Sequence, residues 1–141
     1  MTKRSFPDIN VWFATAVADH VHHPAAAAWW NETGSLVGFS RITQLGLLRL
    51  LTTSATMGGM PLTNSEAWRV YDAFLADDRV RVFPELPEME RRFRASTEQS
   101  QSSPKQWADA YIAAYAEANE ATLVTFDRGF EKYGIPCRIL E

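Results

Sequence analysis

The feature that most constrains the fold of this chain is the alternation of short apolar runs with helical patterns. The apolar run at 36–39 lies between Gly34 and Ser40, and a stripe of isoleucine and leucine at helical spacing follows it to Leu51. A short run of this kind is typical of a buried strand, and the stripe is typical of an amphipathic helix. Strands that alternate with helices favour a parallel sheet covered by helices on both faces. The sequence therefore predicts an α/β fold.

The same signals divide the rest of the chain into elements. Ser40 and Thr63 are candidate helix N-caps, and Thr63 begins a T-N-S-E capping box. Pro24 and Pro104 also mark helix starts. We predict strands at 3–7, 36–39, 79–83, 121–126 and 137–140. We predict helices at 9–17, 24–30, 40–51, 64–75, 88–95 and 104–119.

The bulk composition indicates one folded domain over residues 1–141. The chain is 46% hydrophobic and 22% charged, and 141 residues are enough to bury a core without disulfides. Its single cysteine, Cys137, excludes an internal disulfide and a multi-cysteine zinc site, and it suits the cytoplasm. No segment has the pattern of a signal peptide or the length of a membrane span. A net charge of −3 excludes nucleic-acid binding through overall basicity.

Three aspartates stand among apolar neighbours where a strand gives way to a helix or loop. Asp8 and Asp127 directly follow predicted strands, and Asp109 lies early in a predicted helix. Because ligands gather at the carboxyl ends of parallel strands, we expect the three side chains to converge on that edge of the sheet. A charge in apolar surroundings is costly unless a partner compensates it, and Mg²⁺ or Mn²⁺ takes carboxylate oxygens as ligands. The positions therefore indicate a candidate cation site.

Four motifs along the chain resemble those of the PIN-domain family. They are P-D-I-N-V-W, S-R-I-T-Q-L-G-L-L-R-L, W-A-D-A-Y-I-A-A-Y-A and L-V-T-F-D-R-G-F, in the order and at the spacing of the family. The closest likeness is to the VapC ribonuclease toxins of prokaryotic toxin–antitoxin pairs. The resemblance implies a Rossmann-like three-layer α/β/α sandwich with a mainly parallel sheet and Mg²⁺- or Mn²⁺-dependent endonucleolytic cleavage of RNA. It also implies a homodimer and inhibition by a small cognate antitoxin.

Residue by residue, the resemblance makes Asp8, Asp109 and Asp127 the metal-binding and catalytic acids. It favours Asp8 and Asp109 as direct ligands and Asp127 as a direct or water-mediated one. Asn10 matches the polar residue that supports the first acid, and Thr125 matches the hydroxyl residue two positions before the last. The chemistry agrees, since phosphodiester hydrolysis needs an activated water and a neutralised leaving oxygen, and metal ions held by carboxylates supply both.

The middle motif departs from the family pattern. Many PIN domains carry a glutamate three residues after the threonine that matches Thr43, but here Gly46 stands at that place, and no Asp or Glu occurs from residue 33 to 65. Three acids favour one tightly held ion over two. We expect Thr43 and Gln44 to support the site, with Gln44 orienting a coordinated water. We expect Gly46 to let substrate or antitoxin approach the backbone closely.

Other interpretations of these residues stay open. Asp8 could serve only as a helix N-cap, and Asp127 with the R-G that follows it could form only a surface turn. The H-V-H-H run at 20–23 fits a solvated loop better than a zinc site, because no cysteine stands nearby. A second class of function is a catalytically silent PIN scaffold that binds RNA or a protein partner, which the missing glutamate motivates. A receiver-like phospho-acceptor domain would need paired acids near the first strand, and the sequence does not supply them there.

Overall fold

A five-stranded, all-parallel sheet forms the centre of the molecule, which the computed structural model describes from residue 2 to residue 141. The strand order is β3-β2-β1-β4-β5, so the first strand lies in the middle. Each neighbouring pair is parallel, with Ser5 of β1 opposite Val37 of β2 and Thr122 of β4. The bounds of the strands are Arg4–Pro7 (β1), Leu36–Phe39 (β2), Val80–Val82 (β3), Thr122–Thr125 (β4) and Cys137–Ile139 (β5).

Helices cover both faces of this sheet and enclose a separate apolar core on each. One core lies under α1 to α4 and includes Trp12, Trp29 and Leu47, and the other lies under α5, α6 and η1 and includes Ile112 and Phe130. Successive strand residues alternate between the two cores, as the pleat of a strand requires. The predicted three-layer α/β/α sandwich is confirmed. The bounds of the helices are Ile9–Ala16 (α1), His23–Glu32 (α2), Arg41–Leu51 (α3), Asn64–Leu75 (α4), Met89–Thr97 (α5), Gln106–Ala118 (α6) and Arg128–Tyr133 (η1).

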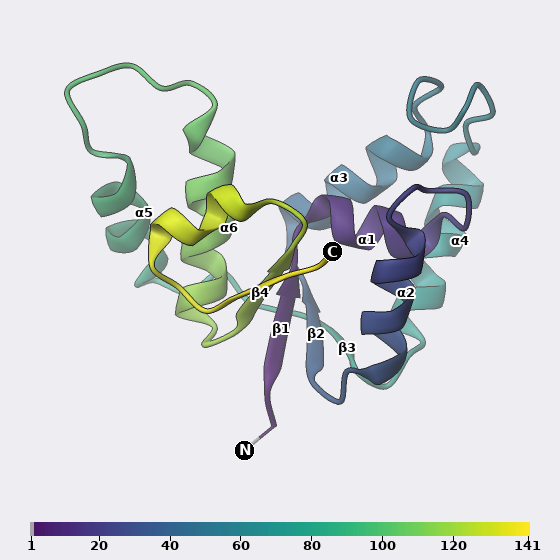
Figure 1. Ribbon diagram of the computed structural model, residues 1–141, viewed down its shortest axis with the longest axis horizontal. Coiled ribbons are helices and arrows are strands. Elements are labelled where there is room, and N and C mark those ends of the chain that lie inside the picture. The colour runs from purple at the N-terminus through teal and green to yellow at the C-terminus, as the bar shows by residue number, and fades with distance from the viewer. Residues whose placement is uncertain (1) are drawn as a thin grey trace.

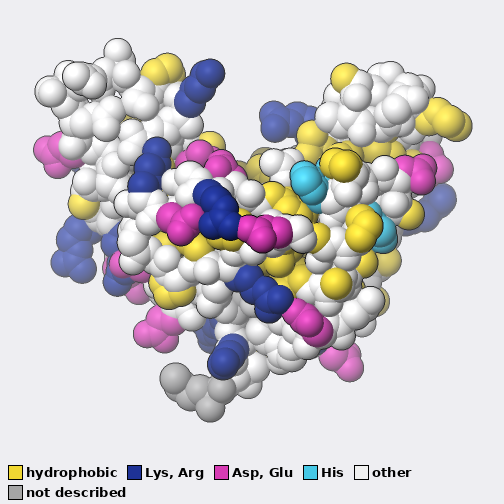
Figure 2. Space-filling view, in the orientation of Figure 1, with side chains coloured by type: hydrophobic (Ala, Val, Ile, Leu, Met, Phe, Trp, Pro, Cys, Tyr) yellow, Lys and Arg dark blue, Asp and Glu magenta, His cyan; other side chains and the backbone are white. Residues whose placement is uncertain are grey.

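The helices extend past the carboxyl ends of the strands as two arms (Figure 1). One arm consists of α5, α6 and the loop between them, and the other contains α3, α4 and their connecting loop. The space-filling view shows the surface hollowed between the arms, with Lys and Arg side chains on both sides of the hollow (Figure 2). The strand ends, where ligands gather in parallel sheets, therefore lie at the bottom of this hollow.

Local sequence signals account for most helix boundaries. Ser40 caps α3 by accepting a hydrogen bond from the backbone N–H of Thr43, and Thr63 forms the predicted capping box with Glu66 at the start of α4. One element was not predicted. The 3₁₀ helix η1 begins after Asp127 and is anchored by a buried phenylalanine in the second core.

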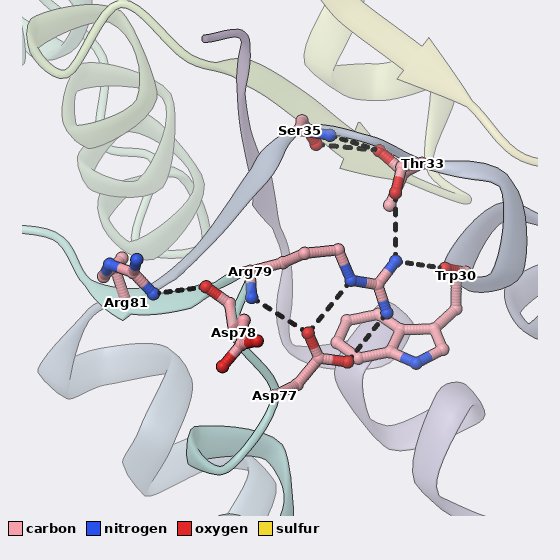
Figure 3. A network of polar contacts seen from close by, with 7 residues as sticks. All are labelled: Trp30, Thr33, Ser35, Asp77, Asp78, Arg79 and Arg81. Atoms are coloured by element: carbon pink, nitrogen blue, oxygen red, sulfur yellow. Dashed lines mark hydrogen bonds and ion pairs between the residues drawn. The ribbon is translucent and has the colours of Figure 1, made fainter.

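A polar network at the opposite edge of the sheet fastens α2 to the start of β3 (Figure 3). The Arg79 guanidinium donates to both carboxylate oxygens of Asp77, at 3.0 and 2.9 Å. It also donates to the backbone carbonyls of Trp30 and Thr33, at 2.6 and 3.0 Å, and lies 4.3 Å from the centre of the Trp30 ring. Arg79 therefore caps the last turn of α2, where carbonyls lack helical partners.

Across residues 2–141, none of the helices has the length and apolar character needed to cross a membrane.

Candidate active site

Asp8 is the buried acid at the centre of the sheet edge. It directly follows β1, and its backbone N–H donates to the carbonyl of Val124 on β4 at 3.0 Å. One carboxylate oxygen caps α1 by accepting from the N–H of Val11 at 3.1 Å. The other oxygen accepts from the hydroxyl of Thr125 at 2.5 Å. With 7% of its surface exposed, Asp8 is a carboxyl group almost removed from water.

The Thr125 hydroxyl links the first and last acids. Thr125 ends β4 and is fully buried. While its oxygen donates to Asp8, it accepts from the backbone N–H of Asp127 at 3.0 Å. The exposed carboxylate of Asp127 in turn accepts from the N–H of Gly129 at 2.7 Å and so caps η1. Two neighbouring strand ends and the start of η1 are thereby held in one arrangement.

Asp109 approaches the same edge from the first turn of α6, where it is half-buried. Its electrostatic neighbours come from the segment after β4, namely the carboxylate of Asp127 and the ammonium of Lys132. Tyr133 lies close by as well: burial raises the pKa of its phenol, and the nearby charge of Asp109 raises it further. The helix η1 therefore brings one cation and one phenol to the third acid.

The pKa values of Asp8 and Asp109 are raised, and the charge of Asp127 contributes to both shifts. Burial raises the pKa of Asp8 from 3.8 to about 6, against hydrogen bonds from Thr125, Val11 and Asn10, and the charge of Asp127 raises it further. Burial also raises the pKa of Asp109, the charge of Asp127 adds to this, and Lys132 opposes it. Asp127 thus lies within electrostatic reach of both other acids, and a bound cation would favour the ionised form of each.

The side chains do not stand in a closed metal cage. Over residues 2–141, no three His, Cys, Asp or Glu side chains are grouped closely enough to hold a metal ion. This applies to the three histidines at 20–23 too, where His22 is exposed and His23 opens α2. For the aspartates, the donor set still fits a hard cation in kind, since it consists of carboxylate oxygens with a buried hydroxyl beside them.

The residues expected to support the acids take different positions. Asn10 is exposed and reaches Asp8 through its backbone N–H. Thr43 is fully buried in the capping box of α3. Gln44 is also buried, and its amide oxygen accepts from the guanidinium of Arg41 at 2.5 Å. Both α3 residues therefore shape the start of the helix that borders the acids.

Gly46 does not expose its backbone, and the expectation of close approach by substrate or antitoxin is wrong. A Cβ at this position would lie 2.5 to 2.8 Å from three atoms of the Ile9 side chain, well inside van der Waals contact. Ile9 directly follows Asp8 and packs across the face of α3 where the family glutamate would begin. The chain has therefore replaced that acid with an apolar contact between α1 and α3.

Sequence reasoning missed a cavity at the carboxyl ends of β2 and β3. It has a volume of 210 Å³ and lies between the start of α3, the end of β3 and α6. The carboxylate of Glu85 and the phenol of Tyr111 line it, together with Gln44. No local signal could have found it, because its walls come from segments more than 60 residues apart. Lys132 and Tyr133 were missed for a simpler reason, since the helix that carries them was not predicted. The φ of 68° at Gly134, which ends that helix, indicates the kind of glycine stop that could have revealed it.

Comparison with known proteins places this geometry in a family. The PIN domain matches residues 5–136. Ribonuclease VapC41 from Mycobacterium tuberculosis is 43% identical over 140 residues, which cover 94% of this chain and 96% of that protein. Ribonuclease VapC29 from the same organism is 30% identical over 122 residues, which cover 86% of this chain and 84% of that protein.

Two solved structures share the fold. The crystal structure of Mycobacterium tuberculosis VapC20, a Sarcin-Ricin loop cleaving toxin, has a TM-score of 0.69 and 19% identity, and covers 93% of this chain and 95% of that chain. VapBC2 from Rickettsia felis, bound to a DNA fragment from its promoter, has a TM-score of 0.66 and 15% identity, with coverage of 98% and 99%. At these identities the likeness extends to the fold alone.

Proposed function

The chain belongs to the PIN-domain family and is a homologue of the VapC ribonucleases, and from this premise we propose that it is the ribonuclease toxin of a toxin–antitoxin pair. The whole chain, residues 1–141, would form one PIN domain that acts on RNA in the cytoplasm. The observation that carries the proposal is the arrangement of Asp8, Thr125 and Asp127. A buried carboxyl group, a shared hydroxyl and a second acid meet at the strand ends, in a hollow bordered by basic side chains.

The proposed catalytic and metal-binding residues are Asp8, Asp109 and Asp127, with Mg²⁺ or Mn²⁺ as the cation. When bound, such an ion supplies an activated water and neutralises charge on the scissile phosphate. The protein's own part is to hold the acids. Thr125 fixes the orientation of Asp8 by its short hydrogen bond, and α6 carries Asp109 toward the same edge. Asn10, Thr43 and Gln44 would act by positioning these elements.

One ion fits this donor set better than two. The place of the family's middle glutamate is occupied by the contact between Gly46 and Ile9, so α3 offers no acid to a second ion. A single ion would have to draw three carboxylates together, because they are not grouped as a closed cage among residues 2–141. Burial raises the pKa values of Asp8 and Asp109, and a bound cation would lower them, because it stabilises the ionised forms that burial disfavours.

The test combines a binding readout with an activity readout. We expect Mn²⁺ to raise the melting temperature of the wild type and to support cleavage of single-stranded RNA. Asp8→Asn and Asp109→Asn should lose both effects while they keep the circular dichroism spectrum of the fold. Asp19→Asn, an exposed acid in the turn after α1, is the matched control and should behave as the wild type. Unchanged cleavage in both site variants would remove the assignment.

A catalytically silent PIN scaffold is the second candidate, and the missing fourth acid and the open arrangement of the other three favour it. It predicts no Mn²⁺-dependent rise in melting temperature and no cleavage, with RNA or a protein partner still bound. Isothermal titration with Mn²⁺ separates the two candidates, because only the nuclease requires the ion.

We also propose a small cognate antitoxin and a homodimer as partners. One solved relative by fold is a VapBC2 structure, and this chain leaves large apolar side chains exposed on α3 and α4. Leu45 is 57% exposed and Trp68 is 48% exposed. Light scattering of the purified chain tests the dimer, with Trp68→Ser as the variant expected to weaken it.

A further inference from the structure

We propose that the 210 Å³ cavity at the carboxyl ends of β2 and β3 is a nucleobase pocket that selects guanine near the cleaved phosphate, an inference that rests on the ribonuclease function proposed above. It names a specificity determinant that the catalytic acids do not supply. The determinant is the pair formed by Glu85 and Arg41 on the rim of the cavity.

The walls of the cavity suit a flat heterocycle. The buried part consists of aromatic and amide side chains, with Tyr71 and Gln44 each 5% exposed and Tyr115 4% exposed. The hydroxyl of Tyr115 donates to the backbone carbonyl of Phe83, and the ring stacks on Phe6, so its position in the wall is fixed. A volume of 210 Å³ is below the roughly 300–1,000 Å³ of sites for drug-sized ligands, and leaves room for a single base. Proteins read single-stranded RNA by stacking such unpaired bases on aromatic side chains.

The cavity opens at the same edge of the sheet as the acids, because Arg41 follows β2 and Val82 ends β3. Its α3 wall begins directly after β2 with Arg41, and its outer wall includes Val82 at the end of β3. Asp8 follows β1, and the sheet order places β2 and then β3 beside β1. With neighbouring strands about 5 Å apart, the ends of β2 and β3 lie about 5 and 10 Å along this edge from the end of β1.

The charged groups on the rim distinguish a base from a phosphate. Glu85 is an exposed acid that would repel a phosphate, and its carboxylate is near the Tyr111 phenol, whose pKa is raised by burial and by a hydrogen bond with Glu85. Arg41 also lines the cavity; one of its nitrogens donates to the Gln44 oxygen, and its other N–H groups remain as donors. The lining therefore offers a carboxylate acceptor from Glu85, beside the acceptor site that Tyr111 uses, and N–H donors from Arg41.

Guanine matches that pattern. It presents the acceptors O6 and N7 on one edge and N–H donors, including the exocyclic N2 amine, on another. Arg is the side chain that most often reads O6 and N7 in two hydrogen bonds, and a carboxylate accepts from adjacent N–H groups. Adenine has no donor pair for Glu85, and cytosine and uracil have no O6 and N7 pair for Arg41.

The first experiment measures base preference during cleavage. A pool of single-stranded oligoribonucleotides with randomised positions is cut in the presence of Mn²⁺, and the product ends are sequenced. We expect guanine to be enriched at one fixed position beside the cut. Glu85→Gln should reduce that preference by about tenfold or more, as loss of a two-point base contact does, while cleavage of substrates with other bases is retained. Glu88→Gln, an exposed acid three residues further on, is the control and should keep the preference.

The second experiment measures binding without catalysis. In the Asp8→Asn variant, we expect 5′-GMP to bind at least fivefold more tightly than 5′-AMP, 5′-CMP or 5′-UMP, and the added change Glu85→Gln to abolish that difference. These ligands share one phosphate, so only the base distinguishes them. Equal affinities, or a guanine preference that survives Glu85→Gln, would overturn the pocket. If the wild type cuts no member of the pool, the proposed ribonuclease function fails, and the nucleotide titration still decides whether the pocket reads guanine.

Discussion

The contact between Gly46 and Ile9 makes a measurable prediction about why the fourth acid is absent. In the interior of a helix, Gly→Ala normally raises stability by roughly 0.5–1 kcal/mol, because glycine loses the most backbone entropy on folding. At Gly46 the new Cβ would meet the Cδ1, Cγ1 and Cγ2 atoms of Ile9 at 2.5, 2.6 and 2.8 Å. Carbon atoms pack favourably at about 3.5–4.0 Å, so the overlap is about 1 Å against three atoms.

The steric cost of an overlap on this scale exceeds the stability that alanine adds to the helix. Because Cγ2 is attached directly to Cβ, rotation of a distal methyl group cannot relieve the contact, and α1 and α3 must move apart. Overpacking of this kind costs about 1–3 kcal/mol, so Gly46→Ala should lower the free energy of unfolding by about 1–2 kcal/mol. In the background Ile9→Ala all three clashing atoms are removed, and Gly46→Ala should instead raise the free energy of unfolding by about 0.5–1 kcal/mol. The expected coupling free energy is therefore about 2 kcal/mol.

A double-mutant cycle measured by urea unfolding provides the assay. The four proteins are the wild type, the two single variants and the double variant, all without divalent cations. Gly34→Ala is the matched control, because nothing lies within 4 Å of a Cβ at that position, and it should change stability by no more than about 0.5 kcal/mol in either background. If Gly46→Ala has the same effect with and without Ile9, steric exclusion does not explain the missing acid.

Two further predictions concern pH. Burial raises the pKa of Asp8 from 3.8 to about 6, so the folded state binds this proton more tightly and ionisation destabilises it as the pH rises through that window. Without divalent cations, Asp8→Asn should therefore raise the free energy of unfolding by up to about 3 kcal/mol at pH 7.5 and change it little at pH 4, as measured by urea unfolding. A difference between variant and wild type that does not change with pH would contradict this. Hydrogen bonds from Arg79 lower the pKa of Asp77 to about 2, so its contribution is present above about pH 4 and is lost as the pH falls toward 2. Asp77→Asn should lower the free energy of unfolding by at most about 2 kcal/mol at pH 7 and by little at pH 2, since the side chains of Arg79 and Asp77 are 27% and 29% exposed. Asp78→Asn, at an exposed neighbour, should change it little at either pH.

Local patterns were sufficient to predict the layers and most of the boundaries of this fold. The apolar run at 36–39 became β2, and the Ser40 cap and the leucine stripe became α3, because burial and capping act over a few neighbouring residues. The strand order could not be obtained in this way, since it depends on how crossovers pack. The helix η1 was missed because one buried phenylalanine and a tertiary contact stabilise it, and no periodic pattern marks it.

In the candidate site, too, features set by neighbouring residues were predictable, and features set by tertiary contacts were not. Asp8 and Asp127 were predictable because Asp8 directly follows β1 and Asp127 lies two residues after the end of β4, and parallel strands end at a common edge. The Thr125 hydroxyl that joins them is a contact over 117 residues, and the packing of Ile9 on Gly46 joins two different helices. Neither contact can be predicted from the pattern of a few neighbouring residues. The expectation about Gly46 failed for this reason, since a glycine in the sequence does not say which side chain lies over it.

In the structure, the two oxygens of the Asp8 carboxylate have different partners, so a capping role does not exclude the proposed chemical role. One oxygen of the carboxylate caps α1, and the other faces Thr125, so a single side chain fills both positions. Asparagine caps a helix about as well as aspartate and carries no charge to desolvate. A residue selected only for capping at a site with 7% exposure would therefore gain stability by being asparagine. The buried carboxylate imposes an electrostatic cost that the cap does not require, and a cation shared with Asp109 and Asp127 is the partner that would offset it.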